Sequence, residues 1–212
     1  MTATTTPRRA SIIHGYRATP DDHWFPWLAA RLHAEGIPAT VPALPGPTAP
    51  DPIDWARAVA TDIGTPDGGS IIVAHSLGCL TVLRHLATLP PPTRVGALVL
   101  VAGFLEPLPA LPELDTFIGH GIDAAHLRER VDHLTVLRSD ADDYVPTGHT
   151  DRLAAELGTT ATVVPAAGHF LATDGVTTLA AALEPIRAHV ASSRRNTNMR
   201  NSRSPESSHS IS

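Results

Sequence analysis

The stretch SIIVAHSLGCLTVLRHL, residues 70–86, decides the fold. Residues 70–74 form a short run rich in β-branched side chains, and from Leu77 onward the apolar residues recur with helical spacing. A strand that runs directly into a helix places Ser76 on an abrupt turn at the carboxyl edge of a sheet, where its hydroxyl is held outward. The stretch therefore predicts an α/β sheet that presents a serine hydroxyl at its edge.

The rest of the chain repeats this alternation of strand and helix. Strands are predicted at residues 10–13, 39–41, 70–74, 97–102, 134–137 and 160–164. Helices are predicted at residues 24–35, 54–63, 77–89, 150–157 and 175–192, with a short one within residues 124–133. Strand–helix–strand repeats of this kind form a mainly parallel sheet with helices on both faces. The proline-rich segments 38–52 and 107–112 are expected to be loops on the rim.

Length and composition limit the domain count and the class of ligand. The 212 residues, of which 42% are hydrophobic, suit one domain with a single core. The formal net charge of −5 gives no basic footprint, so we expect a small-molecule substrate and no nucleic acid partner. Cys79 is the sole cysteine, which excludes an intramolecular disulfide and a thiolate zinc cluster.

Both ends of the chain are predicted to lie outside the folded domain. Residues 1–9 are expected to be a flexible N-terminal tail and residues 192–212 a disordered tail rich in Ser, Arg and Asn, which leaves residues 10–191 as the domain. The longest apolar run, residues 95–105, is far shorter than the roughly 20 residues that cross a bilayer. We therefore expect a cytoplasmic protein without a membrane partner, and the sequence identifies no protein partner.

The residues around Ser76 match a known catalytic pattern with one exception. The pattern is G-x-S-x-G, and the pentapeptide Ala74-His75-Ser76-Leu77-Gly78 has alanine in place of the first glycine. Taken alone, the motif has two interpretations, because Ser76 is either a nucleophile or only the N-cap of the helix. A nucleophilic serine requires a base to remove its proton and a carboxylate to orient that base.

Both partners of such a serine follow later in the chain. The sequence PAAGHFLAT, residues 165–173, places His169 in a loop behind the last predicted strand. The preceding strand ends just before Asp140, Asp142 and Asp143, each of which is a candidate for the acid. The order serine, aspartate, histidine is that of α/β-hydrolases and differs from the two other familiar triad orders. The three signals together favour the nucleophile over the helix cap.

Attack by a serine also needs N–H donors for the oxyanion that forms on the substrate. The amide of Leu77, first in the predicted helix, supplies one donor, and the amide of Tyr16, in the loop after the first strand, is the candidate for the second. The alternative for the Tyr16 loop is a glycine turn with a packing tyrosine. His14, Gly15 and His75 are the candidates for lining the substrate pocket.

Seven motifs carry a family resemblance, which covers about residues 11–189. They are His14-Gly15, Trp24-x-x-Trp27-Leu28, Pro42-x-x-Pro45, Trp55, His75-Ser76-Leu77-Gly78-Cys79, Asp140-x-Asp142-x-x-Val145-Pro146 and Gly168-His169-Phe170. Together they resemble the small serine hydrolases of the retinoblastoma-binding protein 9/YdeN-like family. The resemblance implies a compact α/β-hydrolase fold without a large lid domain, and a Ser/Asp/His triad of Ser76, Asp142 and His169. The departures are Ala74 in place of glycine, and Asp143 where relatives often have proline.

Two classes of function remain open from the sequence. The first is a carboxylesterase-like serine hydrolase that cleaves a small ester, thioester or amide through an acyl-serine intermediate, or an acyltransferase or perhydrolase that uses the same triad. The second is a non-catalytic interaction protein on a hydrolase scaffold. No cofactor is expected, and no metal either, because the twelve histidines form none of the helical pairs that bind zinc.

Overall fold

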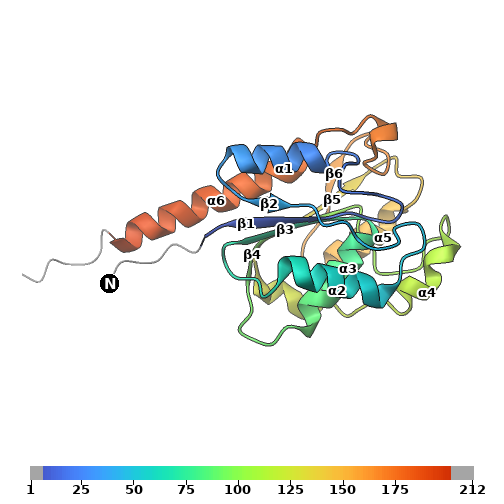
Figure 1. The fold of residues 1–212 in the computed structure, drawn as a ribbon, viewed down its shortest axis with the longest axis horizontal. Coiled ribbons are helices and arrows are strands. Elements are labelled where there is room, and N and C mark those ends of the chain that lie inside the picture. Colours follow the sequence, from blue (N-terminus) through green and yellow to red (C-terminus); the bar gives the residue numbers. More distant parts are fainter. Residues whose placement is uncertain (1–6, 202–212) are drawn as a thin grey trace, which may run out of the picture.

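Residues 7–201 of the 212-residue chain are described by the computed structural model. They contain a six-stranded sheet, with every neighbouring pair parallel, in the order β2-β1-β3-β4-β5-β6 (Figure 1). The strands are β1 (Arg9–Ile13), β2 (Ala39–Thr40), β3 (Ser70–His75), β4 (Val95–Val101), β5 (Val131–Ser139) and β6 (Thr162–Val164). The mainly parallel sheet predicted from the sequence is therefore confirmed.

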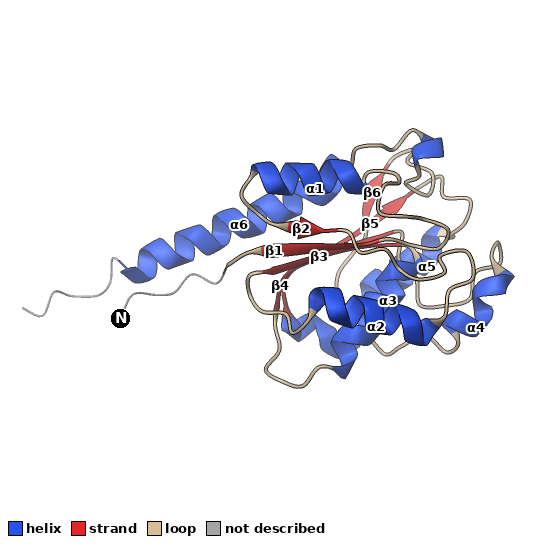
Figure 2. Ribbon diagram, in the orientation of Figure 1, coloured by secondary structure: helices blue, strands red, loops and turns tan. Residues whose placement is uncertain are grey.

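Helices cover both faces of the sheet. They are α1 (Phe25–Ala34), α2 (Pro52–Ile63), α3 (Leu77–Thr88), α4 (Asp115–Ile118), α5 (Thr147–Glu156) and α6 (Ala180–Asn201). Three 3₁₀ turns, η1 (Pro112–Leu114), η2 (Ala125–Arg130) and η3 (Ala172–Asp174), complete the elements. Figure 2 shows α1 and α6 on one face of the sheet, and α2 and α3 on the other.

The central strand β3 explains why both faces are covered. Its successive side chains alternate between two apolar cores: Ile71 and Val73 pack with α1 and α6, whereas Ile72 and Ala74 pack with α2 and α3. All residues of β3 are buried, as expected for a parallel strand with helices on both sides. This arrangement places the carboxyl end of β3, and Ser76 after it, at the edge of the sheet.

The structure differs from the predicted tails at both ends of the domain. Strand β1 begins at Arg9, which pairs with Ser70 and lies 3.4 Å from the Asp67 carboxylate. Helix α6 continues to Asn201, so the part of the predicted tail from Ser192 to Asn201 is helical. No Pro or Gly interrupts that segment, so the helical hydrogen-bond ladder does not end at the domain boundary. The rest of both predicted tails, residues 1–6 and 202–212, lies outside the described residues.

The segment between β4 and β5 holds only short elements, namely η1, α4 and η2. The helix expected within residues 124–133 is a 3₁₀ turn that ends at Arg130, because Val131 already pairs with Val95 in the sheet. No lid domain is built from this part of the chain. Within residues 7–201, no helix combines the length and apolar character that a membrane span requires.

Candidate active site

Ser76 lies on the sharp turn between β3 and α3. Its backbone has φ 54° and ψ −125°, a conformation that a residue with a side chain rarely adopts. The amide of Ser76 donates to the carbonyl of Val101 at 2.9 Å, which holds the turn against β4. Two glycines make room for it: a Cβ on Gly15 would lie 2.8 Å from the Ser76 Cβ, and one on Gly78 would lie 2.5 Å from the His14 carbonyl oxygen. The turn thus depends on two glycines, one in the loop after β1 and one in the first turn of α3.

Three side chains meet at this turn in hydrogen-bonding distance. The His169 Nε2 lies 2.9 Å from the Ser76 Oγ, and the His169 Nδ1 lies 2.8 Å from the Asp142 Oδ2. A carboxylate only accepts, so Nδ1 carries the proton of the neutral ring and Nε2 accepts from the serine hydroxyl. The side chains of His169 and Asp142 are 8% and 4% exposed, which keeps most water away from the pair. This is the geometry required for a base-activated serine.

The structure separates the three aspartates that the sequence left as alternatives. Only one oxygen of Asp142 faces His169; the other accepts hydrogen bonds from the amides of Tyr144 and Val145, both at 2.9 Å. Asp140 instead accepts from the amide of Ala166 at 2.7 Å, and Asp143 is exposed. Geometry therefore favours Asp142 as the residue that orients His169.

The backbone of His169 is fixed at both its polar groups. Its amide donates to the Asp174 Oδ2 at 2.8 Å, and its carbonyl accepts from the His75 Nε2 at 2.9 Å. The same Asp174 oxygen accepts from the amide of Leu171 at 3.0 Å, which closes the loop on itself. A Cβ on Gly168, whose φ is 53°, would collide with the Asp174 carboxylate. His169 is thus held in a tight loop although it lies outside any helix or strand.

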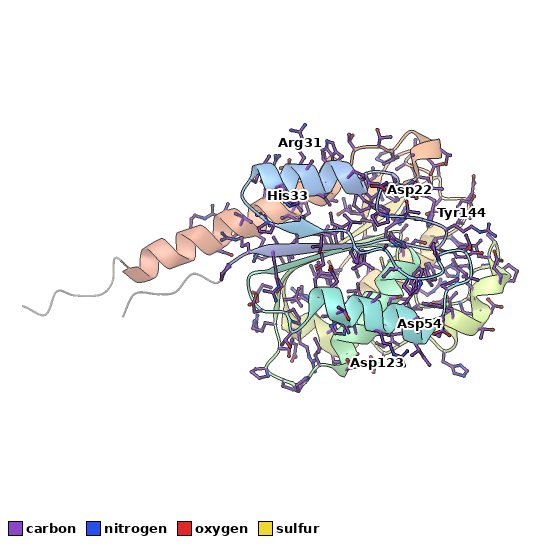
Figure 3. All side chains as sticks on the ribbon, in the orientation of Figure 1. Asp22, Arg31, His33, Asp54, Asp123 and Tyr144 are labelled. Carbon is purple, nitrogen blue, oxygen red and sulfur yellow. The ribbon has the colours of Figure 1, made fainter. Side chains whose placement is uncertain are left out.

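A pocket of about 130 Å³ opens beside Ser76 and His169. Its lining residues are Tyr16, Arg17, His23, Ser76, Leu111, Tyr144, His169 and Leu171. They come from the five connections that follow β1, β3, β4, β5 and β6, at the edge where the strands end. Figure 3 shows Asp22 and Tyr144 at this same end of the molecule, whereas Arg31 lies on α1. Sequence reasoning missed five of these residues, because nothing in an irregular loop indicates which side chain turns toward the site.

Two of the three predicted pocket residues serve a different purpose. His75 is buried, its ring packs against Trp24 and Phe25, and it contacts the backbone of His169 from behind. His14 is also buried, and its Nε2 accepts from the amide of Leu44 at 3.0 Å. Neither ring lines the pocket, because both point from the end of a strand into the packed interior. Burial lowers the pKa of His14 and holds the pKa of His75 well below its ordinary value, which favours the neutral form of both rings.

Gly15 also does not line the pocket, although it lies against Ser76. The residue after Gly15, Tyr16, does line the pocket. On the other side of Ser76, Leu77 is the first residue of α3, where a helical amide has no carbonyl partner within the helix. Of the two predicted oxyanion donors, Leu77 follows Ser76 directly in the chain and Tyr16 lines the same pocket. Their role as donors stays a prediction.

Cys79 is a buried structural residue. Its Sγ donates to the carbonyl of Ala74 at 3.3 Å, and burial raises the pKa of the thiol. A thiol that stays protonated is a poor nucleophile and a poor metal ligand. Among residues 7–201, no group of three or more His, Cys, Asp or Glu side chains is arranged to hold a metal ion.

Comparisons with known proteins identify relatives of this chain in sequence and in fold. A sequence model of the serine hydrolase family matches residues 10–187. The chain is 37% identical to the YdeN protein of Bacillus subtilis over 172 residues, which cover 81% of this chain and 90% of that protein. The crystal structure of the B. subtilis ydeN gene product has a TM-score of 0.83 at 35% identity, over 87% of this chain and 99% of that chain. Est1E from Butyrivibrio proteoclasticus shares the fold, with a TM-score of 0.64 at 14% identity over 87% of this chain and 89% of its own.

Proposed function

Since the chain belongs to the serine hydrolase family, we propose that it cleaves a small ester, thioester or amide through an acyl-Ser76 intermediate, as a carboxylesterase-like enzyme. One observation carries this proposal: a single imidazole, that of His169, lies within hydrogen-bonding distance of both Ser76 and Asp142. A serine that only capped a helix would need neither partner. An interaction protein would gain nothing from a strained Ser76 backbone.

The first half of the reaction forms the acyl-enzyme. The His169 Nε2 takes the hydroxyl proton while the Ser76 Oγ forms a bond to the substrate carbonyl carbon. The negative charge that develops on the carbonyl oxygen is stabilised by the amides of Leu77 and Tyr16, and one such donor is worth about 3 kcal/mol. The tetrahedral intermediate then collapses: the bond to the leaving group breaks, and His169 gives that group the proton.

The second half repeats the steps with water. His169 removes a proton from the water, whose oxygen attacks the acyl carbon, and then returns the proton to Ser76 as the acid leaves. Asp142 stabilises the imidazolium that exists during each transfer. The amides of Tyr144 and Val145 donate hydrogen bonds to its second oxygen, and these bonds keep the carboxylate from rotating away from His169.

The test is ester hydrolysis by the wild-type protein and by Ser76→Ala. We expect the wild type to hydrolyse p-nitrophenyl acetate, and the variant to lose about 10⁴-fold or more in kcat. Ser76 lines the pocket and packs into no apolar core, so the unfolding midpoint of the variant should stay close to that of the wild type. Turnover retained by the variant would refute the acyl-serine mechanism. Release of p-nitrophenol that requires an added alcohol, with the ester of that alcohol as the product, would indicate an acyltransferase.

A further inference from the structure

On the basis of this hydrolase function, we propose that Arg17 and His23 form an anion-binding subsite in the pocket, and that the preferred substrate is an ester or thioester that carries a carboxylate. Both side chains line the same pocket as Ser76 and His169. The other lining side chains outside the triad, those of Tyr16, Leu111, Tyr144 and Leu171, are aromatic or apolar. Arg17 and His23 therefore supply the nitrogen donors of the pocket outside the triad, and the other polar atoms of these lining side chains are the hydroxyls of Tyr16 and Tyr144.

The backbone presents both residues in an unusual way. Arg17 has φ 57° and His23 has φ 56°, values that non-glycine residues rarely adopt and that occur preferentially at functional sites. Surrounding contacts keep the loop in place. The amide of Arg17 donates to the carbonyl of Pro47 at 2.8 Å, and Asp22 accepts from the amide and the hydroxyl of Thr19 at 2.6 and 2.8 Å. Ser76 is the third pocket residue with such a backbone.

One hydrogen bond sets the tautomer of His23. Its Nδ1 accepts from the amide of Ala172 at 3.0 Å, so the proton of the neutral ring is on Nε2. In residues 7–201, Nε2 makes no hydrogen bond to another group. Burial lowers the pKa of His23 and thus favours the neutral ring, against the opposing effect of the Asp22 charge. His23 therefore offers the pocket one N–H donor from a fixed position.

The Arg17 side chain lines the pocket, and within residues 7–201 its guanidinium donates no hydrogen bond. The closest carboxylate oxygen, Glu113 Oε1, is 3.7 Å from Nη2, which is longer than a hydrogen bond, and the guanidinium lies 4.7 Å above the Tyr16 ring. Arg152 differs, because it donates to both oxygens of Glu106 at 2.6 and 2.7 Å. A free guanidinium fork matches the two oxygens of a carboxylate.

The charge count favours a carboxylate over a phosphate ester. The subsite has one cation and one neutral donor, and the carboxylates of Glu113 and Asp22 lie beside them. A singly charged, planar carboxylate matches one guanidinium fork and one N–H donor, whereas the second charge of a phosphate monoester would be repelled by Glu113 and Asp22 with no second cation to offset it. The carboxylate can belong to the acyl part of the substrate or to its leaving group, and the experiment has one arm for each.

The experiment compares matched esters with and without the charge. The acyl arm uses monoethyl succinate against ethyl succinamate, and the leaving-group arm uses 4-acetoxybenzoate against 4-acetoxybenzamide. In each variant the readout is the ratio of kcat/KM for the charged ester to that for the amide analogue. Comparing this ratio between wild type and variant cancels the difference in intrinsic reactivity between the two esters. We expect Arg17→Gln to lower this ratio about tenfold in at least one arm, since a charge-assisted hydrogen bond is lost.

Three further variants sharpen the result. His23→Asn keeps an acceptor for the Ala172 amide, tolerates a positive φ and removes the Nε2 donor, so it should lower the ratio in the same arm. Glu113→Gln should raise the ratio, because it removes the competing carboxylate. Arg31→Gln is the control. Arg31 also stacks on an aromatic ring, that of Trp27, but it lies on α1 outside the pocket. The kcat/KM values for the charged ester and for the amide analogue should therefore both stay unchanged.

A binding measurement separates failure of the subsite from failure of the proposed function. In Ser76→Ala, which cannot form the acyl-enzyme, at least one of the two charged esters should raise Tm more than its amide analogue, and adding Arg17→Gln should remove the difference. The proposal is overturned if the ratio in the wild type equals that in Arg17→Gln in both arms and the Tm difference is absent. Absence of all hydrolysis with the Tm difference retained would overturn the proposed function alone.

Discussion

At the scale of single residues, Asp142 shows how position and not residue type assigns a role. Three aspartates follow β5 within four positions of the sequence, and only Asp142 contacts His169. Asp140 has a structural hydrogen bond to the loop that carries His169, through the amide of Ala166. Because the three differ in contacts but not in chemistry, they form a matched set of variants.

We therefore expect Asp142→Asn to lower kcat by about 10⁴-fold, because an amide in that place holds His169 in the wrong tautomer and leaves the imidazolium without a counter-charge. Asp143→Asn should stay within about twofold of the wild type, since the Asp143 side chain makes no contact with His169. Steady-state hydrolysis of p-nitrophenyl acetate by all three Asp→Asn variants checks this. A larger loss in Asp140→Asn or Asp143→Asn would mean that the acid is not Asp142.

Some residues of the site could be predicted from the sequence, and others could not. Ser76 and His169 follow from the strand–turn–helix pattern and the chain order, and the choice of Asp142 needed the spacing to Pro146 that the family resemblance supplied. His14 and His75 were wrongly expected in the pocket, because proximity to the nucleophile in sequence does not say which way a strand-end side chain points. Arg17 and His23 were missed, since a positive φ in a loop has no sequence signature for a residue other than glycine.

At the scale of elements, the loop between β6 and η3 shows how an irregular segment achieves rigidity. Asp174 accepts from two amides of the loop, and His75 donates to the His169 carbonyl from the core side. The loop is therefore fixed by side chains in place of a helical or sheet ladder. Its precision matters, because a misplacement of about 1 Å at a reacting group can cost 10²-fold in rate.

For this loop we expect Asp174→Ala to lower kcat by about 10- to 100-fold with little change in KM. Asp174→Asn keeps one carbonyl oxygen as acceptor and should recover most of the rate. Urea unfolding of both variants provides the control, because a loss of stability alone would not lower the kcat of the protein that remains folded. Unchanged kcat in Asp174→Ala would show that the loop is held without this carboxylate.

The segment between β4 and β5 forms part of the pocket wall. Only η1, α4 and η2 occupy this segment, and Leu111 is the residue that it contributes to the pocket of about 130 Å³. A pocket this small buries few methylenes, and each one left in water forgoes about 0.8 kcal/mol. Long acyl chains therefore gain little transition-state binding.

We expect p-nitrophenyl acetate and butyrate to have kcat/KM at least equal to that of the palmitate, and no activation at a lipid interface. The series should be measured below the concentrations at which the esters form micelles. A specificity constant that rises steadily with chain length would show that the segment around Leu111 opens into a longer apolar channel.

At the scale of the whole molecule, the α/β architecture follows from the sequence more securely than the ends of the chain do. The alternation of β-rich and helical segments predicted all six strands in nearly their observed places. The prediction that residues 192–201 belong to a disordered tail was wrong, because α6 continues to Asn201. These residues carry no apolar face, and their composition is typical of unfolded segments. Apolar periodicity reports packing against a core, and a helix that extends beyond the core has no such signal.

Several buried histidines give the whole fold a dependence on pH. Burial lowers the pKa of His14, His75 and His189 from the ordinary value of 6.5. As the pH falls below that value, the unfolded chain takes up protons that the folded chain does not, so acid favours the unfolded state. Each such histidine contributes a slope of at most about 1.4 kcal/mol per pH unit.

We therefore expect the urea midpoint to fall between about pH 7.5 and about pH 5, before most carboxylates titrate. His75→Phe should flatten this dependence, although it also removes the hydrogen bond to the His169 carbonyl and so lowers activity. Unfolding curves at matched ionic strength supply the data. A midpoint that is constant or rises toward acid pH would mean that these histidines are charged in the folded protein.

The central claim is that Ser76 is an activated nucleophile, and covalent labelling tests it most directly. A fluorophosphonate probe reacts with a serine only when a base removes the proton of its hydroxyl, and the adduct is located by mass spectrometry of the digested protein. We predict one label per chain, on Ser76, with labelling strongly slowed in His169→Ala and absent in Ser76→Ala. A folded wild-type protein that stays unlabelled, or that is labelled at the same rate when His169 is replaced, would contradict the account.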